Sequence, residues 1–496
     1  MFDKLHNALQ RVSDDYLLEA ETYKKKRSIP WVAAVAAVLA VAILAGVLLN
    51  PGTQRPVLQG TEPVEVTGPV RFQNPADLKL ANMVAAPSYP QMVQKPDRAA
   101  FLNDYEAYRA AEKLWKEDQK LHYDQPVGYA DSLADFFERS IREFLQGDEN
   151  VVYSPVNVYM ALAMLAETTG GNSRAQLLEL LGLDSIEDLR AQAEHVWNAH
   201  YAADGETTLL LGNSLWLDDF YGFHQNTVET LAGNYHASVF HGDLGTQAMN
   251  EQLQSWLDAH TGDLLREEAG NIKLDPATVF SLASTVYFSA GWENGFSKLD
   301  NTQKEFHCKE HDLITTFMNR SLFGTYYMGE NFGAVRLDLS GDNAMWLILP
   351  DEGVSLEEVI AGGEYLEMTL NPGSWEKQVD IKINLSLPKF DVSSQMDLID
   401  GMKNMGITDI FDYTTADFRP MSDTGALYVD KINHAGRVVI DEEGVIAAAF
   451  TVITSYGGVV MPPELKEIDF ILDRPFLFVV SSRDRLPLFA GTVYEP

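Results

Sequence analysis

Cysteine and basic residues are scarce in this chain. Cys308 is the only cysteine among 496 residues, so no disulfide can form within the chain. Lysine and arginine total 37 against 72 acidic residues, which leaves a formal net charge of −35. A surface of this charge repels phosphates, so we predict no nucleic-acid partner. Together the two deficits favour a solvated protein outside the cell that does not rely on disulfides, and a bacterial surface protein would fit.

The motifs of several catalytic classes are also missing. The sequence has no Gly-x-Ser-x-Gly elbow, no His-Glu-x-x-His and no glycine-rich phosphate loop. His307, Cys308 and His311 lie close together in "HCKEH", a spacing that could suit a metal, but no second cysteine exists to complete a typical site. We therefore predict that the chain is not an enzyme and carries no metal or other cofactor.

One long hydrophobic run is present near the N-terminus. It extends from Trp31 to Leu49 without a charge, follows the basic residues 24–27, and is long enough to cross a bilayer as a helix. Because basic residues stay on the cytoplasmic side, we predict a single-pass membrane protein whose remainder lies outside the cell. A cleaved signal peptide is the alternative, although the run exceeds a usual signal core.

Composition divides the chain into four segments. Residues 1–27 form a cytoplasmic segment with helical apolar spacing, and residues 28–50 form the transmembrane helix. Residues 51–126 contain many prolines, which suit an extended stalk, and end in a helix near 97–122 that we expect to dock on the following domain. Residues 127–496 form the globular domain.

The globular segment begins with helices and ends with strands. Ser154 and the proline after it begin one helix, and Asn172 or Ser173 caps the next, which ends at Gly182. Alternating apolar residues over 379–387 predict a strand with one solvated face. The C-terminus is typical of two buried strands joined by a charged turn. This order indicates an α+β fold.

Seven stretches of the globular segment resemble, in this order, the successive signatures of the serpin family of serine protease inhibitors. The resemblance covers residues 127–496 and implies three β-sheets, about nine helices and a reactive loop near the C-terminus that is offered to a protease. The stretches are "NVVYSPVNVYMALAMLAETTGGNSRAQLLELLGL", "VYFSAGWENGF", "MWLILPDEG", "LPKFDVSS", "MGITDIF", "INHAGRVVIDEEGVIAAAFT" and "DRPFLFVV" with "LFAGTVYEP".

One long stretch near the C-terminus lacks charge, and the resemblance implies a reason. Between Val445 and Pro463 only Tyr456 could ionise, and only in strong base. In the family, the part of the loop before the cleaved bond inserts into the main sheet and carries the acylated protease with it. An inserting strand cannot carry unpaired charges, because burying each of them would cost several kcal/mol.

The resemblance also implies a hinge, in which Gly444 is the pivot. Period-two geometry then divides the strand after Gly444 into two faces. The bulky Phe450 falls on the outward face, whereas Val445 and Ile446 depart from the family's usual threonine and glutamate. The inward face has Val445, Ala447, Ala449, Thr451, Ile453 and Ser455. The full hinge is Glu442, Glu443, Gly444, Val445, Ile446, Ala447, Ala448, Ala449, Phe450 and Thr451.

Two spacings place the cleaved bond close to Val459. The family's usual distance from Gly444 puts the scissile carbonyl on Gly458, and the distance back from "PPE" at Pro462 puts it on Val459. Valine fills the small apolar pocket of an elastase-like protease, whereas glycine offers that pocket nothing to bind. We predict cleavage between Val459 and Val460, with Gly458 as the near alternative. Trypsin-like enzymes should fail, since the loop has no lysine or arginine.

Five further positions match the parts of the family that open the sheet. Ser154 and His434 match the polar cluster beneath the strands that separate, and Trp292 matches the tryptophan where the loop first inserts. Asn157 and Ser284 stand where the family has serine and asparagine, which suggests that hydrogen-bonding partners were exchanged. Each position also has a plain structural interpretation, as a satisfied buried polar group or a core aromatic residue.

Two functions from different classes follow. The first is a membrane-tethered, monomeric inhibitor that acts as an irreversible suicide substrate of serine proteases. The second is a non-inhibitory serpin that acts as a surface binding module. The small residues at 447–449 and the uncharged loop favour the first.

The membrane anchor can be tested on intact cells. Protease shaving should release a fragment that starts within residues 51–125, because the apolar run holds the preceding residues in the bilayer. N-terminal sequencing of the released fragment measures this. A mature secreted protein that begins near residue 50 would contradict the anchor.

Overall fold

The computed structural model describes residues 57–59, 78–101, 104–262, 264–265, 272–424, 427–429, 431–445 and 466–496. All of these residues belong to one unit, residues 57–496. No helix in the described ranges is both long and apolar enough to cross a bilayer. The apolar run 31–49 lies outside those ranges.

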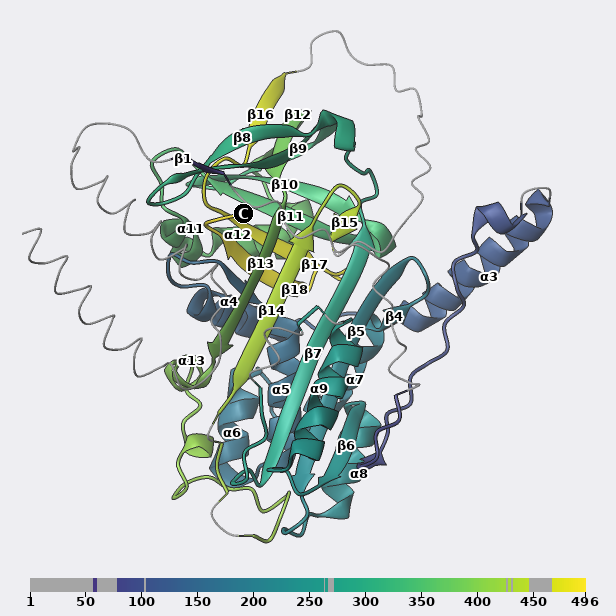
Figure 1. Cartoon of the computed structure of the whole chain (residues 1–496), viewed down its shortest axis with the longest axis vertical. Helices are drawn as coiled ribbons and strands as arrows, with labels where there is room; N and C mark the ends of the chain where they lie inside the picture. The colour runs from purple at the N-terminus through teal and green to yellow at the C-terminus, as the bar shows by residue number, and fades with distance from the viewer. Residues whose placement is uncertain are drawn as a thin grey trace, which may run out of the picture. The chain divides into compact units, whose positions relative to one another are not determined.

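Ten of the described strands form the larger of two sheets (Figure 1). They are β1 (Val57–Gln59), β3 (Val151–Tyr153), β8 (Thr302–His307), β9 (Asp312–Met328), β10 (Phe332–Leu339), β11 (Asn343–Pro350), β12 (Gln378–Pro388), β16 (Glu467–Ile471), β17 (Phe476–Ser481) and β18 (Pro487–Val493). The order is β16-β12-β9-β10-β11-β17-β18-β3, and β1 and β8 also pair with β9.

The smaller sheet has eight described strands and includes the hinge residues Gly444 and Val445. They are β2 (Met83–Ala85), β4 (Ala202–Ala203), β5 (Thr207–Asp218), β6 (Ala237–Gly242), β7 (Phe280–Gly291), β13 (Phe390–Asp397), β14 (Asn433–Ile440) and β15 (Gly444–Val445). Their order is β13-β14-β15-β7-β5-β6-β2, with β4 beside β5. Only the β5 and β6 pair is parallel among the pairings of this sheet.

The expected count of three sheets was wrong for the described strands, because β9 links its neighbours into one continuous sheet. This strand is 17 residues long. It pairs with β8 at its start, with β12 along most of its length and with β10 at its end. β8, β10 and β12 therefore belong to one sheet through β9.

Ten α-helices lie in the described residues, and nine of them fall within 127–496. They are α3 (Tyr105–Tyr123), α4 (Leu133–Phe144), α5 (Pro155–Thr168), α6 (Gly171–Leu180), α7 (Ile186–His200), α8 (Gln225–Asn234), α9 (Gln247–Thr261), α11 (Leu356–Gly362), α12 (Glu364–Leu370) and α13 (Ile399–Asn404). Short 3-10 turns are η2 (Arg98–Phe101), η3 (Lys298–Asp300), η4 (Ser340–Asp342), η5 (Pro372–Ser374) and η6 (Asp409–Phe411).

The helix starts show where local signals decide the structure. α5 begins as predicted, with the Ser154 side chain accepting a hydrogen bond at the N-terminus and a proline in the first turn. The prediction for α6 was wrong, because its N-cap is Gly170 rather than Asn172 or Ser173. The hydroxyl of Ser173 instead accepts a hydrogen bond from the backbone N–H of Asp417, so a distant contact replaces the local cap.

Helices pack on both faces of the smaller sheet because β5 is apolar on both. Leu215 and Leu217 belong to the same core as α5, whereas Trp216 between them packs with Trp256 of α9. α5 is buried almost all round and contacts both β7 and β18. It therefore lies between the two sheets, while α9 covers the opposite face of the smaller one.

The helix before the globular domain docks on the loop that precedes β5. It begins at Tyr105, later than the predicted start near residue 97. Trp115 is buried, and its Nε1 donates a hydrogen bond to the Asp204 carboxylate at 3.3 Å. The ammonium of Lys95 lies 5.3 Å from the centre of the Trp115 ring, and the Lys95 N–H donates to Asp204 O at 2.6 Å. Trp115 is thus the anchor of α3.

Replacing Trp115 with Ala should undock α3, because truncating a buried tryptophan costs about 3–5 kcal/mol. Hydrogen–deuterium exchange of residues 105–123 should then rise, while exchange in α5 stays as in the parent chain. Leu114→Ala is the matched control, since Leu114 is exposed on the same helix. Equal hydrogen–deuterium exchange of residues 105–123 in the Trp115→Ala and Leu114→Ala variants would contradict the role of Trp115 as the anchor of α3.

Candidate functional site

The described end of the hinge, β15, lies between β14 and β7. On one side Val445 pairs with Ile440 of β14. On the other side Gly444 pairs with Gly291 and Val445 with Ala290, both in β7. Among the described residues, β14 and β7 are not paired with each other and are joined only through β15 (Figure 1). We call the space between β7 and β14 the slot, and β15 fills one end of it.

Gly444 allows β15 to approach β7 closely. A Cβ atom at this position would lie 2.3 Å from Ala290 O and 2.8 Å from Gly291 Cα, which no side chain could tolerate. The next residue, Val445, is 1% exposed and belongs to the main hydrophobic core. The structure therefore places Val445 on the inward face.

A tight turn delivers the chain from β14 into β15. One carboxylate oxygen of Asp441 accepts hydrogen bonds from the N–H groups of Glu443 at 2.8 Å and Gly444 at 3.2 Å. The Trp292 indole Nε1 donates to Asp441 O at 2.8 Å, and the Trp292 N–H donates to Glu443 O at 3.0 Å. Trp292 thus holds the turn from the end of β7, where the loop first meets the sheet.

Glu442 is the buried charge of this turn. Its carboxylate forms an ion pair with Lys389 at 2.7 Å and accepts a hydrogen bond from Asn301 at 2.5 Å. Burial raises the pKa of the Glu442 carboxyl, but the bonds from Lys389 and Asn301 outweigh it and the pKa is lowered overall. The last charges before the uncharged run are therefore Glu442, which is paired, and Glu443, which is partly exposed.

Side chains close the slot beyond β15. A cavity of about 10 Å³ lies there, which is room for about one water molecule. Its walls include Val286 and Phe288 of β7 and Ala435 and Gly436 of β14, and Leu264 comes from the segment after α9. A longer β15 would have to displace the side chains that line this cavity.

Ser154 and His434 meet beneath the slot. The Ser154 N–H donates to His434 Nε2 at 3.1 Å, and the Ser154 hydroxyl donates to Leu488 O at 2.6 Å. Burial lowers the pKa of His434 to about 4, so the imidazole is neutral at neutral pH and Nε2 can accept this bond. The pair connects the start of α5 to β14 and β18.

Asn157 and Ser284 also meet, but not side chain to side chain. The Asn157 amide donates to the backbone carbonyl of Ser284 at 3.0 Å. The Ser284 hydroxyl instead donates to the Asn213 side chain of β5 at 2.9 Å. The Asn157 side chain therefore bonds to the Ser284 backbone, while the Ser284 side chain bonds to Asn213.

Sequence reasoning missed four residues of this site. Asp441 and Lys389 shape the hinge turn, Asn301 helps to neutralise Glu442, and Asn213 completes the polar cluster. Only Asn213 carried a local signal, as a polar residue within the apolar run "TLLLGNSLW". The hinge residues Ile446 to Thr451 and the reactive-bond residues Gly458, Val459 and Val460 lie outside the described ranges.

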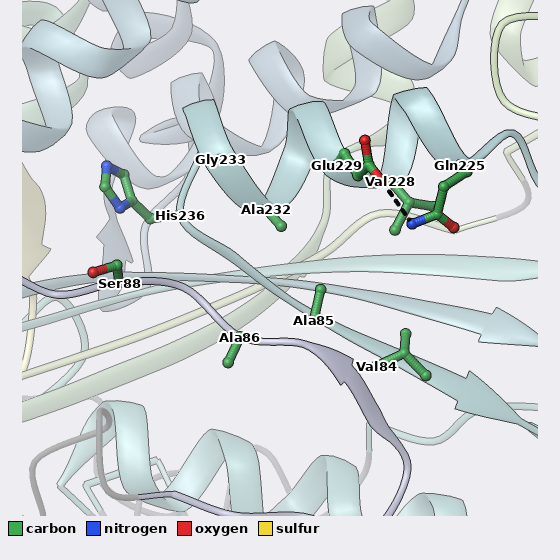
Figure 2. A pocket seen from close by; sticks show the side chains of 10 residues that line it. All are labelled: Val84, Ala85, Ala86, Ser88, Gln225, Val228, Glu229, Ala232, Gly233 and His236. Carbon is green, nitrogen blue, oxygen red and sulfur yellow. Dashed lines mark hydrogen bonds between the residues drawn. The ribbon is translucent and has the colours of Figure 1, made fainter.

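A separate hollow of about 490 Å³ lies between β2, at the outer edge of the smaller sheet, and α8 (Figure 2). Gln225 donates a hydrogen bond to Glu229 along its wall. None of the predicted site residues is among its lining residues, so it is not part of the slot. The lining residues are Val84, Ala85, Ala86, Ser88, Gln225, Val228, Glu229, Ala232, Gly233 and His236.

The chain is similar to known protease inhibitors and to solved serpin structures. It is 28% identical to alpha-1-antiproteinase 2 of Equus caballus over 396 residues, which are 76% of this chain and 89% of that protein. It is 25% identical to neuroserpin of Homo sapiens over 367 residues, 70% of this chain and 87% of that protein. A thermophilic serpin, tengpin, in the native state shares the fold, with 24% identity, a TM-score of 0.65, and coverage of 75% of this chain and 95% of that chain.

A family model described as "Serpin (serine protease inhibitor)" matches residues 132–496. This span contains the hinge, the slot between β7 and β14 and the polar cluster beneath it. Because the match covers most of the chain, this protein belongs to the serpin family.

Proposed function

We propose that this chain is an irreversible suicide-substrate inhibitor of serine proteases, which traps the acyl-enzyme by inserting its reactive loop into the slot. The observation that carries the proposal is β15, the hinge segment that already pairs with strands on both sides. Membership of the serpin family and similarity to an antiproteinase support it. The inhibitor is not itself an enzyme, because the attacking protease supplies the chemistry.

The pairing of β15 defines where each following residue would lie if the strand lengthened in register. Each added residue moves one position toward the start of β7 and one toward the start of β14. Ala447 would then face Phe288 and Val438, which are both buried. A charged side chain at Ala447 would lie between these apolar groups and would oppose insertion.

The same register supports the length of the inserting strand. Thr451 would lie between Ser284 and His434, at the polar cluster beneath the slot. The start of β7, Phe280, would be reached by Ser455, the last residue that the alternation assigns to the inward face. Residues 445–455, the first part of the uncharged run, therefore match the length of strand that β7 can pair.

The class of target protease and the membrane anchor are proposed from the sequence. Val459 fits an elastase-like target, with cleavage between Val459 and Val460. The run 31–49 would tether the domain outside the cell as a single-pass membrane protein, with the inhibitor acting as a monomer. A bacterial source rests on the single cysteine and the stalked anchor, since the relatives from Equus caballus and Homo sapiens are mammalian.

The inhibitory function can be tested with a panel of serine proteases. An elastase-like enzyme should form an SDS-resistant complex with the parent chain, and a trypsin-like enzyme should not. Ala447→Arg should turn the chain into a substrate that is cleaved without being trapped, because a buried guanidinium slows insertion. Ile446→Arg is the matched control, since the same charge at the adjacent position faces outward and should leave most of the complex. Gel densitometry measures the ratio of complex to cleaved chain.

Each outcome of this experiment decides a separate question. If no protease forms a stable complex with the parent chain, the inhibitory function is wrong and a non-inhibitory binding module is favoured. If the parent forms the complex and Ala447→Arg forms it in undiminished yield, the inward face is wrongly assigned.

The reactive bond can be tested by mass spectrometry of the C-terminal peptide released from the denatured complex. We expect a peptide that begins at Val460, because valine rather than glycine fills the specificity pocket. Val459→Arg should transfer cleavage to a trypsin-like enzyme without moving the bond. A peptide that begins at Val459 would shift the bond to Gly458, and a start outside residues 457–461 would overturn the assignment.

A further inference from the structure

Three metal-ligating side chains meet at the end of the larger sheet. Cys308 and His311 lie in the turn between β8 and β9, and Glu495 follows β18. One ligand atom from each of the three side chains lies within 4.8 Å of the other two. The sequence showed the first two residues in "HCKEH", but nothing in it placed Glu495 beside them.

The main chain around Glu495 is firmly positioned. The Asn150 side-chain amide donates to Glu495 O at 2.6 Å, and its oxygen accepts from the N–H groups of Tyr494 at 2.7 Å and Glu495 at 3.1 Å. On the other side, the His307 N–H donates to Asp473 O at 2.6 Å and holds the start of the turn. Both segments therefore present their side chains from fixed backbones, as a preorganised site requires.

The three side chains differ in their exposure to solvent, which increases from Cys308 to His311 to Glu495. Cys308 is 1% exposed, His311 is intermediate, and the Glu495 side chain is 58% exposed. His311 Nε2 and Glu495 Oε1 are 3.7 Å apart, which is longer than a hydrogen bond. The Cys308 sulfur lies 4.0 Å from Phe306 O and also within 4.8 Å of the ligand atoms of His311 and Glu495.

We propose that Cys308, His311 and Glu495 bind one zinc-like divalent cation. Zn²⁺ takes a thiolate sulfur at ~2.3 Å, an imidazole nitrogen at ~2.0 Å and a carboxylate oxygen at ~2.1 Å, so tetrahedral ligand atoms lie ~3.5 Å apart. The ligand atoms would need to approach one another by about 1 Å at most, through small rotations of the His311 and Glu495 side chains. Three protein ligands leave the fourth position to water.

The charge of the chain favours a cation. Its formal net charge is −35, and Lys309, which lies in the same turn as the site, is paired with Asp148. The thiol proton leaves when the metal binds, which makes the affinity rise with pH.

Bound metal would join the end of β18 to the turn between β8 and β9. Both belong to the larger sheet, and the chain after β16 meets the same turn through Asp473. Because the unfolded chain does not bring residues 308 and 495 together, the metal would bind the folded domain preferentially and stabilise it. This site does not depend on the proposed inhibitory function.

Metal titration of the full chain, made without a metal-affinity tag, tests the proposal. Calorimetry with Zn²⁺ should show one ion per chain, and Co²⁺ should give a thiolate-to-cobalt charge-transfer band. Cys308→Ala, Cys308→Ser, His311→Gln and Glu495→Gln should each weaken Zn²⁺ binding by more than about tenfold. His307→Gln and Glu310→Gln are matched controls from the same turn and should change it by less than about twofold.

Loss of metal binding in a variant must be distinguished from loss of folding. Thermal unfolding without metal should show that the variants fold, and the two Cys308 variants give separate chances to preserve the buried position. Absence of the charge-transfer band in the parent chain would overturn the proposal. So would Zn²⁺ affinity that survives in a folded Cys308 variant, or that falls equally in His307→Gln.

Discussion

The structure depends on one constraint, namely how the facing edges of β7 and β14 find hydrogen-bonding partners. Among the described residues, these two strands are connected only through β15. Backbone N–H and C=O groups inside a sheet strongly favour pairing, so a strand that lengthens β15 gains a ladder on both sides. Under the proposed function, the hinge, the slot and the uncharged run act together, because the loop would supply the strand that pairs with both edges.

The hinge turn holds a buried carboxylate together with the groups that neutralise it, at the point where the chain enters the sheet. Glu442 is buried, and Lys389 and Asn301 compensate its carboxylate, whereas Phe288 and Val438 in the slot are buried apolar residues. A buried charge is tolerated only when it is paired, so ionisable side chains end just before Gly444. Gly444 then allows the close approach to β7, which links the composition of the loop to the geometry of the sheet.

Local signals predicted part of the fold and part of the site. The start of α5 followed from Ser154 and its proline, since a cap and a fixed φ act within one turn. The start of α6 did not, because Ser173 bonds to Asp417, a residue 244 positions away. The partner of Ser284 was missed for the same reason. Its hydroxyl reaches Asn213 only because β5 lies beside β7 in the sheet.

The sequence by itself determined the family, the α+β class, the inward position of Val445 and the uncharged character of the loop. These follow from residue types in order along the chain and from the period of a strand, which need no knowledge of distant contacts. Only the tertiary structure decided that Lys389 neutralises Glu442, that β15 occupies one end of the slot, and that Glu495 lies beside Cys308 and His311. Such contacts join residues far apart in sequence, and their proximity exists only once the sheets have formed and packed.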